Sequence, residues 1–528
     1  MWKKSVAIFA GMMLIFAGIS VRVFTLTTGG ELREAADRQS TDRLVISAYR
    51  GTIYDHNMKP LVNKTTRSVA AVAGGSKAAD LLSRALPKEQ FAMVADRITK
   101  GVPFALTVTK GLETGDVIDV FETPVRYADD QLAPHIIGYT DGNGTGVTGM
   151  EKAFDAWLSG GGGEISVSYK VDAYGRALAV GRRIQGAYEE GGQSVVLTLD
   201  ERIQTLAEQV ARDKIGSGAV IVVELPNCEI RAMVSVPDFS VTDIEPALTD
   251  KRSPLLNRAV SAYNAGSVFK LVTAAAALEN GISENLAFDC KGSTTVAGRT
   301  FKCNNEHGHG MMDMEDAMAQ SCNNYFICLA QQVGGKALRA MAERFGIGRR
   351  LELAPGMYGA GGRLPDERAL SAPHALANFS FGQGDLMVTP LQMCAVVQII
   401  TNDGNALPPS LVERTLDQNG RTAADYAQKT ATPVISKRTA KLLKKFMIQC
   451  VENGTGRPGA PDIGGAGAKT GTAETGWKKD NRSVTQAWYV GFCPTEQPRY
   501  AVVVLTEDGH GGGATSGPAF KAIADAVG

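Results

Sequence analysis

The distribution of hydrophobic and polar residues first separates an N-terminal apolar stretch from the rest of the chain. Residues 5–21 carry no charge, and the apolar run continues past Arg22 to Leu26. About 20 apolar residues cross a bilayer as a helix, and an arginine near the helix end can extend its guanidinium to the interface. The pattern therefore predicts a transmembrane anchor at residues 5–26. A cleaved signal peptide is the alternative, although the run is longer than a typical signal core and no clear small-residue cleavage site follows.

The pattern from residue 27 to about residue 190 predicts a separate region without catalytic motifs. Residues 49–74 show short apolar alternations broken by turn residues, which favour strands. Residues 77–99 predict two short helices that are broken near Pro87. The glycine-rich residues 139–169 predict one helix around Met150 to Leu158 between irregular segments.

The pattern becomes more regular from Gln193 onward. Residues 193–214 predict a strand and an amphipathic helix with Asp200 as its cap, and residues 218–237 predict a β-hairpin. Residues 485–509 again read as strand, turn and strand, before a last helix from about Gly517. Strands at both ends of a long helical middle predict an α/β (α+β) domain with a central antiparallel sheet flanked by helices.

Length and charge limit the classes of function. The chain has 528 residues, more than one hydrophobic core usually organises, and its 55 basic and 55 acidic residues give no net charge. Without a basic excess, we expect no nucleic-acid partner. Lys3 and Lys4 precede the apolar run, so the positive-inside rule predicts a cytoplasmic tail at residues 1–4 and an extracytoplasmic location for the rest.

Three short motifs in the C-terminal part carry groups suited to acyl transfer. They are Ser-x-x-Lys at Ser267 and Lys270, Ser-x-Asn at Ser321 and Asn323, and Lys-Thr-Gly at Lys469, Thr470 and Gly471. A serine at a helix start is ordinarily only a cap, and a second Ser-x-Asn occurs at residues 283–285. The order of all three motifs in an exported chain nevertheless favours a catalytic role.

The residue types explain the chemistry that we expect. A serine hydroxyl needs a base, and Lys270 shares a helix face with Ser267 because residues three apart are neighbours. Lysine acts as a base only when neutral, so a nearby cation such as Lys469 would help to lower its pKa. The backbone N–H groups of Ser267 and Thr472 would stabilise the oxyanion.

The other motif residues complete this hypothesis. Ser321 would pass a proton between Lys270 and the leaving amine, and Asn323 would hold the substrate amide. Lys469, Thr470 and Thr472, with Gly471 between the two threonines, offer a charge and two hydroxyls suited to a substrate carboxylate.

The chain resembles the class B penicillin-binding proteins, because its three motifs match the motif set of that family. Further segments resemble the family in order: Arg50–Asp55, His135–Asp155, Phe381–Met393 and Ala487–Pro494. One departure is Ala265, where the family commonly has proline. The resemblance implies an elongated, non-catalytic pedestal or dimerisation-like domain at residues 27–190 and a penicillin-binding transpeptidase domain at residues 191–528.

The resemblance also implies an activity and partners. Ser267 would be acylated by the D-Ala-D-Ala end of a peptidoglycan stem peptide and would transfer the acyl group to an amine of a neighbouring stem. β-Lactams would acylate the same serine, and catalysis would require no cofactor. No acidic glycosyltransferase motif is evident, so a membrane glycosyltransferase is the expected partner. The alternatives are a D,D-carboxypeptidase, a serine β-lactamase, or a non-enzymatic β-lactam sensor or scaffold.

A cluster of cysteines lies between the first two motifs. Cys290, Cys303, His309 and Cys322 form the pattern C-x12-C-x5-H-x12-C, a ligand set suited to tetrahedral zinc. His307 is an alternative ligand. A Cys290–Cys303 disulfide or free thiols are the competing interpretations in an oxidising compartment. Some class B enzymes resemble this chain in carrying a metal site in the same interval.

Overall fold

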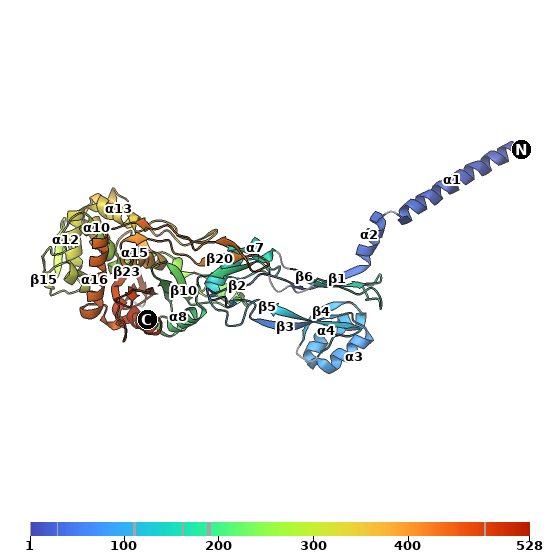
Figure 1. Cartoon of the computed structure of the whole chain (residues 1–528), viewed down its shortest axis with the longest axis horizontal. Helices are drawn as coiled ribbons and strands as arrows, with labels where there is room; N and C mark the ends of the chain where they lie inside the picture. The colour runs from blue at the N-terminus through green and yellow to red at the C-terminus, as the bar shows by residue number, and fades with distance from the viewer. Residues whose placement is uncertain (1, 29, 109–111, 161–162, 187–191, 480–481) are drawn as a thin grey trace. The chain divides into compact units, whose positions relative to one another are not determined.

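The computed structural model describes residues 2–28, 30–108, 112–160, 163–186, 192–479 and 482–528 (Figure 1). The chain divides into two compact units, and each consists of several segments. The first comprises Met1–Arg50, Asn63–Arg126 and Gly161–Gly192, and the second comprises Gly51–Val62, Tyr127–Gly160 and Gln193–Gly528.

The N-terminal apolar stretch forms a single long helix. Helix α1 (Trp2–Thr28) has no buried residue, and the mean hydropathy of its most apolar window is 2.1. It is the one helix among the described residues that is long and apolar enough to cross a membrane. The predicted helix at residues 5–26 is therefore confirmed, with ends slightly beyond the predicted ones.

The rest of the first unit contains two small antiparallel sheets. One has the order β1-β6-β7 and the other the order β4-β3-β5. Leu82 of α3 and Ile98 of α4 pack with Val72 and Phe104 of the second sheet. The helices are separated at Leu86 and Pro87, as the sequence predicts. The bounds in this unit are α2 (Gly30–Gln39), β1 (Thr41–Ala48), β3 (Thr65–Val72), α3 (Ser76–Ala85), α4 (Lys88–Lys100), β4 (Phe104–Val108), β5 (Ile118–Val125), β6 (Glu164–Lys170) and β7 (Arg183–Gln185).

The second unit is built around a five-stranded antiparallel sheet with the order β10-β9-β25-β24-β23. Its strands come from both ends of the unit, which confirms the α+β arrangement that the sequence predicts. The strands are β9 (Gly218–Glu224), β10 (Glu229–Val236), β23 (Gly467–Lys479), β24 (Arg482–Cys493) and β25 (Tyr500–Thr506).

Alternate residues of the central strands bury opposite faces of this sheet. Val220 and Val222 of β9 pack in the cluster of α8 (Glu201–Lys214) and α17 (Gly517–Val527), whereas Ile221 packs in the larger helical core. Successive side chains of a strand point to opposite faces, so a sheet that is covered on both sides requires apolar residues at every position. This explains the uninterrupted apolar runs in the sequence. Asp200 caps α8 by accepting from the amides of Arg202 and Ile203, as predicted.

The segment Gly51–Val62 belongs to the second unit by its contacts. Strand β2 (Ile53–Tyr54) pairs with β8 (Ser194–Leu197). The fully buried Asp55 accepts hydrogen bonds from the amides of Asn57 and Lys59, each at 2.8 Å, and from Glu201 N at the start of α8 at 3.2 Å. A boundary at residues 190 and 191 between two folding domains stays a prediction.

The remaining elements surround the central sheet or connect its strands. The predicted single helix around Met150 to Leu158 is wrong: the chain forms two short helices, because Phe154 leaves helical geometry with φ of −117° and ψ of 27°. The helices are α5 (Pro134–Ile137), α6 (Gly149–Ala153), α7 (Asp155–Ser159), α9 (Glu245–Thr249), α10 (Lys270–Glu279), α11 (Met314–Ala319), α12 (Asn323–Val333), α13 (Gly335–Arg344), α14 (Pro373–Ser380), α15 (Pro390–Thr401) and α16 (Lys437–Asn453). The strands are β11 (Tyr263–Asn264), β12 (Phe288–Cys290), β13 (Ser293–Val296), β14 (Arg299–Lys302), β15 (Gly310–Met312), β16 (Glu352–Ala354), β17 (Met357–Tyr358), β18 (Met387–Val388), β19 (Asn405–Ala406), β20 (Val412–Leu416), β21 (Thr422–Asp425) and β22 (Thr432–Pro433).

Short irregular helices complete the second unit. They are the 3-10 helices η1 (Arg258–Val260), η2 (Gly266–Phe269), η3 (Ala369–Ser371) and η4 (Arg457–Gly459), and the π-helical turn η5 (Gly512–Ser516).

Candidate active site

The serine of the first motif lies on η2, a short helix held closely against the central sheet. Gly266 N donates a hydrogen bond to Gly382 O at 2.8 Å. Gly266 has a φ of 57°, and a Cβ at this position would lie 2.8 Å from Thr472 O on β23. Glycine therefore permits both the left-handed backbone and the close approach of the Ser267 turn to β23.

Ala265 precedes this turn at the position where proline is common in the family that the chain resembles. Its φ is −72°, which lies inside the range that a proline ring imposes, and its side chain is fully buried. Alanine thus adopts a backbone that is compatible with proline here.

Ser267 and Lys270 lie three residues apart where the 3-10 helix passes into α10. Side chains three residues apart in a 3-10 helix are eclipsed, so the two residues share a face. Lys270 is fully buried, and its Nζ donates to Ser321 O at 2.7 Å and to Asn323 Oδ1 at 2.8 Å. Within the described part of the chain, Ser267 Oγ makes no hydrogen bond. The proposed proton transfer between Ser267 and Lys270 stays a prediction.

The hydroxyl of Ser321 lies between the two buried lysines. Lys270 Nζ is 3.2 Å and Lys469 Nζ is 3.0 Å from Ser321 Oγ. Ser321 itself has a φ of 57°, a conformation that non-glycine residues seldom adopt. It precedes the start of α12, where Cys322 is the N-cap. The structure therefore brings Lys270, Ser321, Asn323 and Lys469 into one hydrogen-bonded group.

Burial gives the two lysines different acid–base properties. Desolvation lowers the pKa of Lys270 well below its ordinary value, and the positive charge of Lys469 lowers it further. Desolvation also lowers the pKa of Lys469, to about 8. Lys270 is therefore the lysine that becomes neutral more readily, and Lys469 keeps most of its charge below pH 8.

The third motif lies on β23 beside the Ser267 turn. Thr470 Oγ1 is 2.6 Å from Thr455 Oγ1, and Thr472 Oγ1 accepts from Gly512 N at 3.3 Å. A Cβ at Gly471 would lie 3.0 Å from Val268 Cγ1, so a larger residue would press on the helix that carries Ser267. Thr455 is a residue that the sequence reasoning missed, because it lies on a loop after α16 without a pattern of its own.

Residues of all three motifs line one cavity with a volume of about 820 Å³. Ser267, Ser321 and Asn323 line it together with Thr470, Gly471 and Thr472, whereas the two lysines lie fully buried. No pattern in the sequence indicated that the hairpin β13–β14 and the loop at Gln383 line this cavity. Their lining residues are Arg299, Thr300, Phe301, Lys302, Phe381, Gln383 and Gly384.

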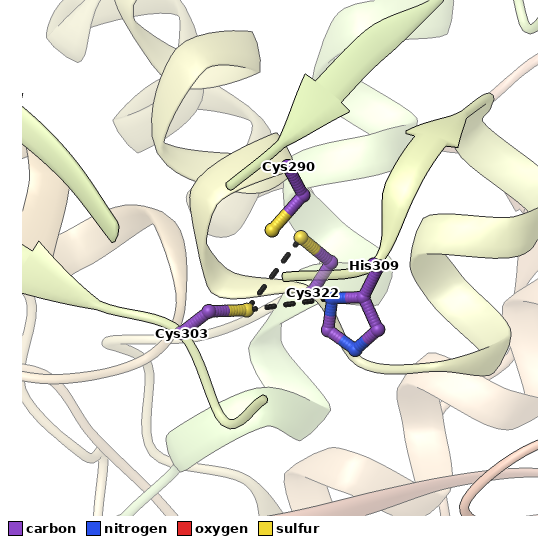
Figure 2. A group of neighbouring side chains, drawn as sticks. All are labelled: Cys290, Cys303, His309 and Cys322. Carbon is purple, nitrogen blue, oxygen red and sulfur yellow. Dashed lines mark hydrogen bonds between the residues drawn. The ribbon is translucent and has the colours of Figure 1, made fainter. Parts of the chain in front are cut away.

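The four residues of the cysteine and histidine pattern come together in the structure (Figure 2). Lys302, Ser321 and Asn323, which are chain neighbours of Cys303 and Cys322, line the cavity. Their sulfur and nitrogen ligand atoms all lie within 4.8 Å of one another. Cys303 Sγ is 3.7 Å from Cys322 Sγ and 3.6 Å from His309 Nδ1. Tetrahedral zinc has bonds of about 2.3 Å to sulfur and about 2.0 Å to nitrogen. Two of its sulfur ligands therefore lie roughly 3.8 Å apart, and a sulfur and a nitrogen ligand lie roughly 3.5 Å apart.

The polar surroundings of this cluster suit thiolate ligands. Tyr325 N donates to Cys322 Sγ at 3.4 Å, and Asn324 Nδ2 donates to Cys290 Sγ at 3.5 Å. The hydrogen bond between the two thiols lowers the pKa of Cys303 and raises the pKa of Cys322, so Cys303 is the thiol of this pair that ionises first. Cys290 and Cys303 are free cysteines in the structure rather than a disulfide. The residues present therefore fit a tetrahedral metal ion.

Comparison with known proteins gives a consistent result. Residues 218–525 match the penicillin binding protein transpeptidase domain. Peptidoglycan D,D-transpeptidase PbpA of Mycolicibacterium smegmatis is 31% identical over 433 residues, which cover 76% of this chain and 82% of that protein. Stage V sporulation protein D of Bacillus subtilis is 29% identical over 419 residues, or 76% of this chain, and the match spans 63% of that relative.

Solved structures extend the similarity to the whole fold. A chain of a peptidoglycan synthase complex, described for its structural coordination of polymerization and crosslinking, matches with a TM-score of 0.72 and 24% identity. The match covers 99% of this chain and 98% of that one.

Proposed function

The chain belongs to the penicillin-binding protein transpeptidases and is a peptidoglycan D,D-transpeptidase, and we propose that it forms its acyl intermediate on Ser267. The observation that carries this proposal is the pair of buried lysines that meet at Ser321 Oγ, beside a cavity that Ser267 lines. Perturbed lysines next to a serine hydroxyl in a cleft are the groups that nucleophilic catalysis requires.

In the first half of the reaction, neutral Lys270 takes the proton of Ser267 as Oγ attacks the carbonyl carbon between the two D-alanines. The backbone N–H groups of Ser267 and Thr472 stabilise the oxyanion. As the C–N bond breaks, Ser321 delivers a proton to the leaving amine of D-alanine and receives one from Lys270. The product is an ester between Ser267 and the shortened stem peptide.

In the second half, an amine of a neighbouring stem peptide attacks this ester. Lys270 accepts the proton of the amine through Ser321, and the proton returns to Ser267 as the ester bond breaks. Before acylation, Asn323 orients the donor amide, and the hydroxyls of Thr470 and Thr472 with the charge of Lys469 behind them hold the terminal carboxylate, which then leaves with D-alanine. Gly471 allows the strand to lie close to the serine. A β-lactam follows the first half, but its amine stays attached after the ring opens.

Labelling with a fluorescent penicillin tests the nucleophile. We expect the full-length chain to be labelled and the variants Ser267→Ala and Ser321→Ala to lose labelling. The chain offers a matched control, since Ser283 heads a second Ser-x-Asn sequence that does not line the cavity. Ser283→Ala should be labelled like the wild type, and labelling that survives Ser267→Ala would overturn the assignment.

The acceptor separates this proposal from a D,D-carboxypeptidase or a β-lactamase. A transpeptidase should hold a penicillin adduct for a long time and should transfer a D-alanyl donor to an added amine. Rapid release of hydrolysed penicillin would instead favour water as the acceptor. Labelling without transfer or hydrolysis would favour a non-enzymatic β-lactam sensor, and the absence of both labelling and transfer would favour a scaffold.

We propose that α1 anchors the protein, with the tail at residues 1–4 in the cytoplasm and the cavity outside. Lys3 and Lys4 before the apolar stretch support this orientation. A membrane glycosyltransferase is the proposed partner, by analogy with the synthase complex that shares the fold. Protease digestion of intact spheroplasts should remove the second unit but not an N-terminal tag, and the reverse result would contradict the orientation.

We also propose that Cys290, Cys303, His309 and Cys322 hold a structural zinc ion. Zinc would cross-link the segment before the second motif to Cys322, which lies between Ser321 and Asn323. Metal analysis of the purified chain should find one zinc per molecule, lost in Cys303→Ser but kept in Cys328→Ser, a control in the same interval. A zinc-free protein at neutral pH, or a Cys290–Cys303 disulfide found by thiol counting, would refute this site.

A further inference from the structure

The hairpin β13–β14 forms a wall of the catalytic cavity that none of the three motifs includes. Arg299, Thr300, Phe301 and Lys302 of this hairpin line the cavity. The hairpin also touches the second motif, because Asn323 Nδ2 donates to Lys302 O at 3.4 Å. This wall therefore lies beside the side chain that we assign to the donor amide.

The wall is the basic part of the cavity surface. Arg299 and Lys302 are the cationic residues among the described lining residues, and Glu474 is the acidic one. The guanidinium of Arg299 lies 5.5 Å from the ring centroid of Phe301 and makes no ion pair among the residues that the structure describes. An exposed guanidinium that faces a substrate cavity without a carboxylate partner is available to bind one.

Lys302 has a partner that it can exchange. Its Nζ is 3.2 Å from Glu306 Oε1, and the side chains are 76% and 72% exposed. Such exposed pairs contribute little free energy, so a substrate carboxylate can compete with Glu306. The hairpin thus presents one unpaired and one weakly paired cation to the cavity.

We propose that this hairpin binds a second carboxylate of the acyl donor, which lies upstream of the D-Ala-D-Ala end. The terminal carboxylate is assigned to Lys469, Thr470 and Thr472 on β23, whereas the hairpin contacts Asn323 and so faces the preceding part of the donor. The enzyme therefore prefers stem peptides with an additional free carboxylate over neutral ones. This inference rests on the proposed acylation of Ser267.

A pair of penicillins tests the inference at the acylation step alone. Carbenicillin differs from benzylpenicillin by one carboxylate on the side chain, so the ratio of their acylation rate constants reports the binding of that group. In each variant this ratio is compared with the wild-type ratio, which cancels the intrinsic reactivity of the two compounds. The full-length protein in detergent is used throughout.

In Arg299→Ala we expect the acylation rate constant of carbenicillin relative to that of benzylpenicillin to fall about fivefold, which is the effect of losing one exposed ion pair. In Arg299→Glu this ratio should fall further. Arg299→Lys should keep this ratio of rate constants close to the wild-type value. In the wild type, 0.5 M salt should lower the ratio, because salt screens the attraction between Arg299 and the carboxylate of carbenicillin. Arg350→Ala is the matched control, because Arg350 lies 4.9 Å from the ring centroid of Tyr358 in a similar stacking contact but does not line the cavity.

The outcomes separate this inference from the proposed function. Acylation of every variant with a ratio within twofold of the wild type would overturn the carboxylate site and leave the Ser267 nucleophile intact. Failure of both penicillins to acylate the wild type would instead overturn the proposed function. A carboxylate preference that appears only during transfer to an acceptor peptide would assign the hairpin to the acceptor and would also overturn the donor site.

Discussion

Replacing Gly266 by alanine tests whether the close contact between η2 and β23 positions the nucleophile. The φ of 57° at Gly266 costs an alanine about 1–2 kcal/mol of folding free energy. In addition, the new Cβ would lie 2.8 Å from Thr472 O, whereas carbon–oxygen contacts are normally about 3.3–3.6 Å. The Ser267 turn and the strand must therefore separate by roughly 0.5 Å.

The magnitude for catalysis follows from this displacement. A misplacement of about 1 Å can lower a rate about 100-fold, so we expect acylation to slow about tenfold. The assay is stopped-flow acylation by a fluorescent penicillin, with the folded fraction measured by circular dichroism. Gly281→Ala is the matched control, because Gly281 has a φ of 79° and a Cβ added there would have no atom within 4 Å.

The control separates backbone strain from displacement of the nucleophile. Both variants should lose about 1–2 kcal/mol of unfolding free energy from the left-handed backbone. Only Gly266→Ala should lose acylation rate beyond the loss of folded protein. Equal acylation rates in the two folded variants would refute the positioning role of this contact.

Three further predictions follow from the geometry of the site and its supports. Burial lowers the pKa of Lys469 to about 8, so the acylation rate should decline above pH 8 as this charge is lost. The free energy of unfolding should rise between pH 8 and 10.5, because the unfolded chain binds more protons than the folded chain in that range. A pH–rate profile that is flat to pH 10 would contradict the role of Lys469. Thr455→Val removes the hydroxyl that lies 2.6 Å from Thr470 Oγ1, and it should raise the KM of a carboxylate-terminated thioester donor about fivefold. Thr455→Ser should restore the wild-type KM, and equal KM values in Thr455→Val and the wild type would argue against a positioning role. Asp55→Ala leaves three backbone amides without their acceptor, so it should lower the free energy of unfolding in urea by about 3 kcal/mol. A loss below about 1 kcal/mol would show that this buried carboxylate does not stabilise the contact between its turn and α8.

The sequence allowed the local part of the site to be predicted. Ser267 and Lys270 are three residues apart on one helical turn, so their shared face follows from helix geometry. The cysteine and histidine pattern was also recognisable, because four ligand types in a short interval form a set that metal ions require. Asp200 and the strands β9, β10, β24 and β25 were predictable from capping and apolar runs.

Other features depend on contacts between distant segments. The left-handed backbone of Gly266 accompanies a close approach to Thr472 on β23, and that of Ser321 accompanies hydrogen bonds to two buried lysines, neither of which a local pattern reveals. Thr455 and Arg299 lie on segments whose place beside the cavity depends on the tertiary fold. The helix around Met150 to Leu158 breaks at Phe154, which has no local breaker such as proline or glycine.

The most direct test of the central claim is the location of the penicillin adduct. Full-length protein is treated with benzylpenicillin, digested, and analysed by tandem mass spectrometry. The proposal predicts one adduct per chain, attached to Ser267 on the peptide that follows Arg258. An adduct on another residue, or unmodified Ser267 in protein that has bound penicillin covalently, would contradict the proposal.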